Sequence, residues 1–437
     1  MIKRRRFPKV FFGWWTVVTC GILALWGHGY HAYGFSALFK PIATELGFSR
    51  AATSIPASIG RLEGGFEGPL SGWITDRFGP KWIIFSGVLI ISLSLILMNF
   101  IHSLWAFYIV WGVILGTGVN IALSVPADTA IANWFVKKRG LALSIKMVFS
   151  GLSGVLVLPL IAWLITVQDW RVTCLMGGVV MGVIGMPLVW YFVKQRRPEY
   201  YGLLPDGTSA EEEAESSQMI DRGVRYAAEV EEVEFTLRQA MRTPAYWLLI
   251  VVNAIHGMAM PAINIHGVPF LTDIGIDPIK AAAMLAMMVL ASTPARLIGG
   301  IIADRIRKQH LRFLMSAAYL TQAIGFTVFL LHQTMPMIYV WFILYGIGMG
   351  VAFVGSVMRA RYFGRKAFGS IQGSSMMFTT PVGVIAPVYC GWIYDTTGSY
   401  LTAFTLFAVL LAFAGVFMFF ILPPKPPSQV TDVRKIV

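Results

Sequence analysis

Long apolar stretches recur along this 437-residue chain, and each is long enough to cross a bilayer as a helix. Apolar residue types make up 56% of the sequence and charged types only 13%, about half of what a soluble domain carries. This composition excludes a soluble multidomain enzyme, a disordered chain and a secreted disulfide scaffold. The sequence predicts an all-α polytopic membrane protein with twelve transmembrane helices. The predicted spans lie near residues 11–38, 51–75, 82–101, 104–132, 141–166, 171–193, 244–271, 281–303, 312–331, 335–358, 369–394 and 399–422.

The net charge of +13 is explained by membrane topology rather than by nucleic-acid binding. With a cytoplasmic N-terminus, all but seven of the 35 Lys and Arg residues fall on cytoplasmic segments, which is the positive-inside pattern. Both termini are therefore predicted to be cytoplasmic. The first apolar run is too long for a cleavable signal, and together with the short loops this favours the cytoplasmic membrane of a prokaryote. The seven basic residues that do not fall on cytoplasmic segments are Lys40, Arg50, Arg171 and Lys280, which lie outside, and Arg61, Lys146 and Arg296, which lie within spans.

One polar segment, residues 194–243, divides the spans into six and six. Because it is rich in glutamate and has few large apolar residues between 206 and 228, a flexible cytoplasmic linker is predicted. The predicted domains are an N-terminal six-helix bundle (1–193), this linker, and a C-terminal six-helix bundle with a cytoplasmic tail (244–437). Nine identities recur at an offset of 228, among them His28 with His256 and Asp76 with Asp304. Such a duplication indicates a repeat-built transporter, whose substrate lies between the halves near the bilayer midplane.

The most specific repeat is a loop that follows the second span and recurs after the eighth. A glycine four residues before an aspartate permits close helix approach, and the aspartate can pair with basic groups or cap a neighbouring helix. The second copy lacks the glycine that follows Arg-Phe in the first. The residues are Gly72, Asp76, Arg77 and Gly79 in the first copy and Gly300, Asp304 and Arg305 in the second.

With this loop the chain resembles the major facilitator superfamily, in which these residues serve the conformational switch. The segments Gly13-Trp14-Trp15 and Asp169-Trp170-Arg171 are similar to the branch of monocarboxylate transporters and oxalate:formate antiporters. The resemblance implies two pseudo-symmetric six-helix bundles that alternate access to the substrate. The sequence has no nucleophile elbow, zinc-protease helix, P-loop or cofactor fingerprint, so it predicts no enzyme, no ATP-driven pump and no cofactor. Its three cysteines lack metal-ligand spacing, so no metal site is predicted.

Ionisable residues inside a span cost about 3 kcal/mol on insertion scales, so each needs a partner or a substrate. The resemblance assigns the substrate carboxylate to Arg296. Arg61 is a further candidate substrate contact because it lies inside the second span. Animal members of the branch place a proton-coupling Asp where this chain has Ser292, so Glu63 or Glu67, which share a helix face, is predicted to couple protons. The alternative is that Arg61, Glu63, Glu67 and Arg296 form a structural ion-pair cluster or a gate, and both interpretations stay open.

Three more polar residues in spans have alternative interpretations. His28 is a predicted substrate contact, because helix 1 lines the cavity in the resembled fold, or else a hydrogen-bonded interior histidine. Gln372 is a predicted substrate contact, because the oxalate branch has a Lys near this position in helix 11. If Gln372 replaces that Lys, a monocarboxylate is favoured over a dicarboxylate. Lys146 is expected to extend to the cytoplasmic interface, with a second anion contact or pairing to Glu67 as alternatives.

The sequence therefore predicts a secondary transporter of small organic anions, chiefly monocarboxylates, with proton symport or anion exchange. One alternative is a facilitator for a neutral, zwitterionic or cationic solute, with span-2 carboxylates binding the cargo and Arg296 acting as a gate. A transporter-like membrane sensor is a further alternative. The expected partners are the organic anion, a proton or counter-anion and the lipid bilayer, not nucleic acid, and the oligomeric state is open.

Overall fold

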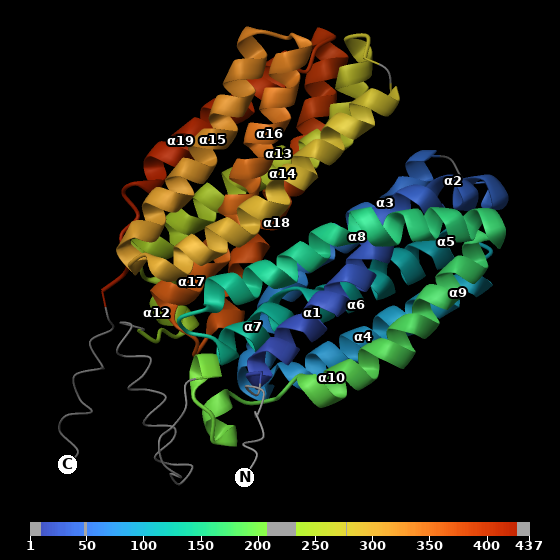
Figure 1. The fold of residues 1–437 in the computed structure, drawn as a ribbon. Coiled ribbons are helices and arrows are strands. Elements are labelled where there is room, and N and C mark those ends of the chain that lie inside the picture. The colour runs from blue at the N-terminus through green and yellow to red at the C-terminus, as the bar shows by residue number, and fades with distance from the viewer. Residues whose placement is uncertain (1–9, 48–49, 208–232, 277, 426–437) are drawn as a thin grey trace, which may run out of the picture.

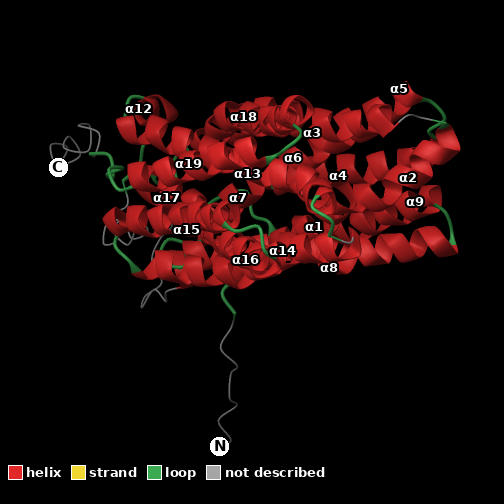
Figure 2. Cartoon of the chain, turned by 90° about the horizontal axis from the view of Figure 1, so that it is seen from above, coloured by secondary structure: helices red, strands yellow, loops and turns green. Residues whose placement is uncertain are grey.

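The computed structural model describes residues 10–47, 50–207, 233–276 and 278–425, and within these ranges the chain is helical and has no strand (Figures 1 and 2). Ten helices of the described chain are long and apolar enough to cross a bilayer. The other two predicted spans, 11–38 and 51–75, are helical as well. The first is less apolar because of its Gly, Trp and His residues, and the second because of Arg61, Glu63 and Glu67. The all-α polytopic prediction is confirmed.

Transmembrane helices 1 to 6 form the N-terminal half. Helix 4 breaks at Ser124 (φ −96°, ψ −116°), two residues before Pro126, whose ring nitrogen cannot donate a backbone hydrogen bond. In order, the helices are α1 (Phe12–His28), a π-helical turn (Gly29–Gly34) and α2 (Phe35–Leu46); α3 (Arg50–Phe78); α4 (Pro80–Leu97); α5 (Leu104–Phe107), a π-helical segment (Tyr108–Leu115), α6 (Gly116–Leu123) and α7 (Val125–Trp134); α8 (Arg139–Val167); and α9 (Trp170–Val180), a π-helical turn (Met181–Gly185) and α10 (Met186–Phe192).

Transmembrane helices 7 to 12 form the C-terminal half and follow the short helix α12 (Leu237–Met241). Its core is aromatic, with Trp341 stacked on Phe329 at 4.5 Å between ring centroids. The domain boundaries at 193 and 244 stay predictions. The helices are α13 (Pro244–Asp273), α14 (Pro278–Arg305), α15 (Leu311–Leu331), α16 (Met335–Ala352) with α17 (Val354–Phe363), α18 (Phe368–Thr397) and α19 (Leu401–Met418).

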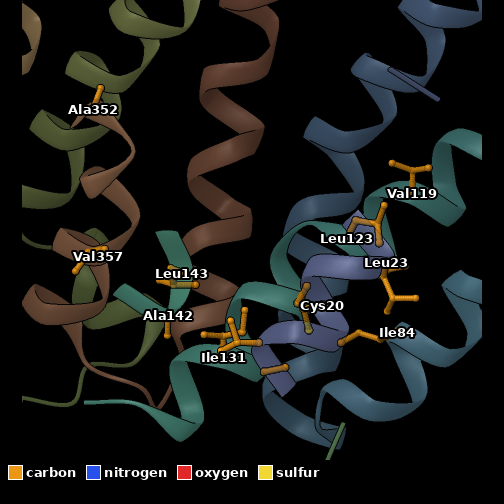
Figure 3. Packing of buried hydrophobic residues seen from close by; sticks show 14 of the residues in the cluster. Cys20, Leu23, Ile84, Val119, Leu123, Ile131, Ala142, Leu143, Ala352 and Val357 are labelled. Carbon is orange, nitrogen blue, oxygen red and sulfur yellow. The ribbon is translucent and has the colours of Figure 1, made fainter. Parts of the chain in front are cut away.

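The two halves are packed together at one end of the molecule and diverge towards the other (Figure 1). The packed end carries both ends of the described chain and the segments flanking residues 208–232, and is here called the terminal end. One hydrophobic cluster runs from Leu23 and Leu143 of the N-terminal half to Val357 of the C-terminal half (Figure 3). A second cluster, around Phe326 and Trp341, belongs to the C-terminal half alone. The apolar core is thus shared between the halves at the terminal end.

Large apolar side chains lie on the outer surface of the bundle. Trp105 is 74% exposed, Val388 71% and Phe420 70%. Leaving so much apolar surface in water would be unfavourable, by about 25 cal/mol per Å², whereas lipid tails solvate it. The chain is therefore a multi-pass integral membrane protein.

Candidate functional site

The halves meet through two helix pairs, α3 with α18 and α8 with α14, which lie on opposite sides of the molecule (Figure 2). Glycine backbones cross at both contacts. A Cβ atom added to Gly72 would lie 2.1 Å from the carbonyl oxygen of Gly369, and one added to Gly140 would lie 2.5 Å from that of Gly300. Any side chain there would force the helices apart. The close approach expected at Gly72 and Gly300 therefore occurs between the halves.

The aspartate of each loop copy caps a helix of the opposite half. Asp76 accepts hydrogen bonds from the backbone N–H of Gly369 (3.1 Å) and of Ser370 (2.7 Å), at the start of α18. The Ser370 hydroxyl donates a third bond to the same carboxylate at 2.7 Å. Asp304 accepts from the N–H groups of Gly140 (2.6 Å) and Leu141 (2.8 Å), at the start of α8. A carboxylate at a helix N-terminus is stabilised by the free N–H groups and the helix dipole. The two caps join the halves reciprocally, because each half supplies one aspartate and one capped helix.

The other loop residues do not cross between the halves. Arg77 is exposed, and its guanidinium lies 5.3 Å from the ring centroid of Trp73 on its own helix. Arg305 is exposed at the end of α14. Gly79 has a φ of +84° and precedes α4, a conformation that a residue with a Cβ rarely adopts. The contact between the halves is thus made by the glycines and aspartates, and the switching role of all seven residues stays a prediction.

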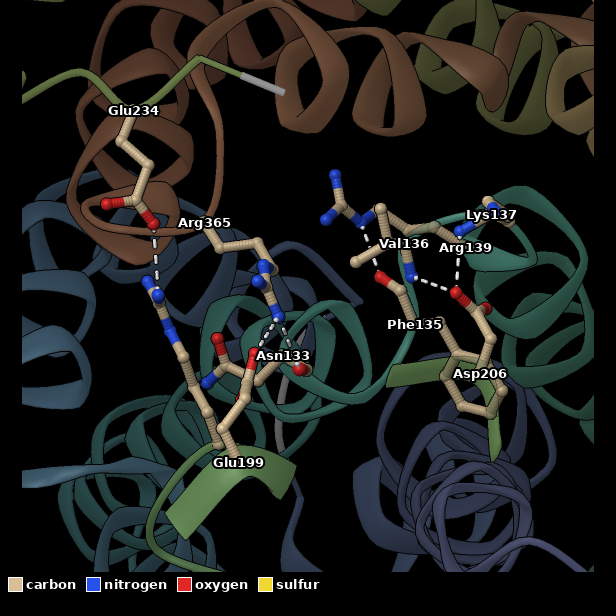
Figure 4. A network of polar contacts seen from close by, with 10 residues as sticks. Asn133, Phe135, Val136, Lys137, Arg139, Glu199, Asp206, Glu234 and Arg365 are labelled. Atoms are coloured by element: carbon tan, nitrogen blue, oxygen red, sulfur yellow. Dashed lines mark hydrogen bonds and ion pairs between the residues drawn. The ribbon is translucent and has the colours of Figure 1, made fainter. Parts of the chain in front are cut away.

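The first flank of the polar segment also binds the terminal end (Figure 4). Asp206, 7% exposed, accepts hydrogen bonds from the N–H groups of Val136 (3.1 Å), Lys137 (2.8 Å) and Lys138 (2.9 Å), just before α8. Two carboxylates, Asp206 from the segment and Asp304 from the other half, therefore bind backbone amides just before and just after the first residue of α8.

Both flanks also contact the C-terminal half near the end of α17, and Figure 4 shows the contact that the first flank makes with the loop between α17 and α18. Arg365 of that loop forms a buried ion pair with Glu199 at 3.2 Å and donates to the carbonyl of Asn133 in the N-terminal half at 3.2 Å. On the second flank, the N–H of Phe235 donates to the carbonyl of Phe363 at 2.9 Å. Residues 208–232 of the predicted linker lie outside the described residues. In the two described flanks, Glu199, Asp206 and Phe235 are buried against the rest of the protein, and the linker at 194–243 stays a prediction.

Arg296 crosses between the halves deeper in the membrane. It lies on α14 eight residues before Asp304, about 12 Å along the helix axis. Its Nη1 donates to the backbone carbonyl of Met147 on α8 at 3.0 Å. Within the described residues, no carboxylate lies within hydrogen-bond distance of this guanidinium. Its other N–H groups have no carboxylate to satisfy them in this conformation.

Lys146, next to Met147, is not at the membrane surface. It is 2% exposed, pairs with Asp128 of α7 at 2.8 Å and donates to the carbonyl of Leu123 at 2.6 Å. The expectation that Lys146 extends to the interface is wrong, because the break in helix 4 supplies a free carbonyl and a carboxylate inside the bundle. Nor does Lys146 pair with Glu67.

Glu63 and Glu67 both face helix 4 of their own half, as their spacing predicts. Glu67 accepts hydrogen bonds from the Thr117 hydroxyl (2.6 Å) and the Asn120 amide (3.2 Å). The Oε2 atom of Glu63 is buried beside Gly116 and has no hydrogen-bond partner among the described residues. Neither carboxylate pairs with Arg296, so these three residues do not form the ion-pair cluster considered above. The side chain of Arg61 lies outside the described residues.

The remaining predicted site residues have polar partners. The Nδ1 atom of His28 lies 2.7 Å from the Ser150 hydroxyl on α8. The Oε1 atom of Gln372 accepts a hydrogen bond from Arg359 of α17 at 2.6 Å. Arg359 was missed by the sequence analysis because hydropathy ends the tenth span at residue 358, whereas the helix runs on to Phe363. Asp128 lies inside the predicted span 104–132, and this position marks it as a buried carboxylate that needs a partner.

Comparison with known proteins places these features in a family. The sequence profile of the Major Facilitator Superfamily matches residues 21–356 and 311–436. Monocarboxylate transporter 13 of Rattus norvegicus is 24% identical over 429 residues, which cover 95% of this chain and 90% of the rat protein.

Two solved structures show the same fold. The human organic anion transporter MFSD10 superposes with a TM-score of 0.69 at 13% identity, covering 94% of this chain and 100% of its own. The proton:xylose symporter XylE gives 0.68 at 11% identity, covering 94% of this chain and 96% of its own. The predicted family is confirmed: this chain belongs to the Major Facilitator Superfamily of membrane transporters.

Proposed function

We propose that this protein carries small organic anions, in particular monocarboxylates, across the membrane by alternating access. The observation that carries the proposal is Arg296, a guanidinium between the halves that binds one backbone carbonyl and no carboxylate of the described chain. A planar carboxylate accepts two parallel hydrogen bonds from such a fork, which a Lys could not offer. The names of two similar proteins, a monocarboxylate transporter and an organic anion transporter, support this substrate class.

The carboxylates of helix 2 are proposed to couple transport to protons. Glu67 already accepts hydrogen bonds from Thr117 and Asn120, so both of its carboxylate oxygens have a donor. Glu63 has a buried oxygen with no donor, so it is the better candidate for carrying a proton during symport. If transport does not depend on a proton gradient, a counter-anion exchanged at Arg296 is the proposed driving partner.

The terminal end is proposed to face the cytoplasm, because the basic residues gather there by the positive-inside rule. Both termini are then cytoplasmic, and the short loops favour a prokaryotic cytoplasmic membrane. The structure would correspond to the state closed to the cytoplasm, held by Asp76 and Asp304. Opening that side requires the bundles 1–193 and 244–437 to separate while the segment 194–243 keeps them tethered.

Uptake into proteoliposomes tests the proposal. Radiolabelled lactate, pyruvate, acetate, formate and oxalate are supplied outside, with and without an inward proton gradient. Arg296→Ala should lower uptake of the transported acid at least about thirtyfold, since truncating a charged partner of a desolvated carboxylate costs about 2 kcal/mol or more. Arg307→Ala, which removes an exposed arginine beyond the end of the same helix, is the matched control. Normal uptake by Arg296→Ala would refute the carboxylate assignment.

The unpartnered oxygen of Glu63 favours one competing function, a facilitator for cationic or zwitterionic solutes. In that case uptake of labelled amines or amino acids should be lost in Glu63→Gln and retained in Arg296→Ala. The opposite pattern, with carboxylic acids as cargo, supports the anion transporter.

A further inference from the structure

Arg359 is a second buried arginine near the contact between the halves, and the function proposed above does not use it. Its side chain is about 9% exposed, within a helix that the chain uses to cross the membrane. Its Nε donates to Gln372 Oε1 at 2.6 Å, and its Nη2 lies 3.4 Å from the Ser356 hydroxyl. Both partners are neutral.

No carboxylate of the described chain is hydrogen-bonded to Arg359. Hydroxyl groups of Tyr246 and Tyr319 act on it from α13 and α15, and Tyr246 is itself bonded to Ser374 at 2.7 Å. Among the described residues, Asp128 of the opposite half is an acidic group whose charge favours the guanidinium of Arg359. Asp128 is already paired with Lys146 at 2.8 Å. A buried guanidinium without a bonded carboxylate is costly unless an anion completes its hydrogen bonds.

Gln372 is oriented by this arginine. An arginine can only donate, so the amide oxygen of Gln372 must face it. The amide nitrogen is then left to donate elsewhere, and it has no acceptor among the described residues. Arg359 and Gln372 together therefore offer a charged donor and a neutral donor to one further anionic group.

The position of this pair differs from that of Arg296. Arg359 lies four residues before the end of α17 and Gln372 four residues after the start of α18, about 6 Å from the terminal end. Arg296 lies nine residues before the end of α14, about 13.5 Å along the helix axis. Helix α18 is held against α3 by the Asp76 cap, so the pair lies on the terminal side of Arg296, within the closed contact.

We propose that Arg359 and Gln372 form a second carboxylate-binding site, which the substrate occupies when the terminal end is open. The anion would pass from Arg296 to Arg359 as the halves rock, so that a cation neutralises it at two successive depths on the way to the terminal end. This inference rests on the proposed anion transport and adds that the substrate is bound by different residues from the two faces of the membrane. Arg359 then sets the apparent affinity from the terminal side, and Arg296 sets it from both sides.

The experiment measures the KM for radiolabelled pyruvate and lactate from each face, in proteoliposomes sorted by accessibility of a tag at the terminal end. Arg359→Gln should raise the KM from the terminal side at least about tenfold, as expected for a lost charge-assisted hydrogen bond, and leave the other side within about twofold. Arg296→Gln should raise both. Lys366→Gln, an exposed charge in the nearby loop, should change neither.

Gln372→Glu separates binding from a structural role. The new carboxylate would lie on Arg359 as a fixed anion, so the pair should hold the fold at least as well as before. The proposal expects a terminal-side KM at least about tenfold higher. Unchanged kinetics in Gln372→Glu, or equal changes from both faces in Arg359→Gln, would overturn it. If the wild-type protein carries neither acid, both the proposed function and this second site fail. If the wild-type protein carries an acid and Arg296→Gln raises the KM from both faces, while Arg359→Gln or Gln372→Glu gives one of the overturning results, only the second site is refuted.

Discussion

Replacing Asp304 by Asn should open the terminal end, because that carboxylate caps α8 from the opposite half. Its two oxygens accept hydrogen bonds from the backbone N–H groups of Gly140 at 2.6 Å and of Leu141 at 2.8 Å. A hydrogen bond to a charged group contributes about 1.5–3 kcal/mol and a neutral one about 1 kcal/mol. The Asn side chain keeps one neutral acceptor, so the closed state loses about 2 kcal/mol, which raises the ratio of open to closed molecules about thirtyfold.

Electron–electron double resonance between spin labels at positions 138 and 366 measures this ratio, because these exposed lysines lie on either side of the closed end. The variant should gain a population with a longer distance, and Arg307→Gln should not. Asp76→Asn should act similarly, and the two effects should add, because the caps lie on different helix pairs and share no partner. A ratio that stays within about twofold of the wild type in Asp304→Asn would show that the cap does not hold this end closed.

Three further predictions concern the interior and the contact between the halves. Glu63→Gln should abolish the stimulation of uptake by a proton gradient, whereas Glu67→Gln should retain it. Initial rates of uptake with and without the gradient measure this stimulation. Equal effects of the two substitutions would contradict the assignment to Glu63. Lys146→Met should lower the free energy of unfolding by about 3–5 kcal/mol, because it leaves Asp128 buried and unpaired, and adding Asp128→Leu should restore most of it; thermal denaturation in detergent of both variants checks this. Gly72→Val should prevent closure, because even a Cβ would lie 2.1 Å from a backbone oxygen; the spin-label distances should then stay long, and a normal closed population would refute the contact.

Hydropathy and the repeat were enough to predict the architecture. A stretch of about twenty apolar residues has few options other than a membrane helix, because the bilayer leaves no backbone group unpaired. The duplicated Gly72 and Asp76 pattern identified the family, because the glycine and the aspartate lie four residues apart and can be recognised together in the sequence. Both inferences use local information only.

The partners of the buried charges needed the tertiary structure. Asp76 and Asp304 each bind amides more than 160 positions away, on the opposite half. Lys146 was expected at the interface, yet the break in helix 4 places Asp128 and a free carbonyl beside it.

Arg359 illustrates the same limit at a helix end. By hydropathy it counts with the basic loop residues, because the apolar run stops just before it. Its burial comes from α17 and α18 folding back on each other and from the opposite half closing over them. The free energy of a charge inside a membrane depends on which groups lie around it in space. The sequence therefore determined which segments cross the membrane and which charges lie near them, while only the packing of the halves decided which of those charges are paired.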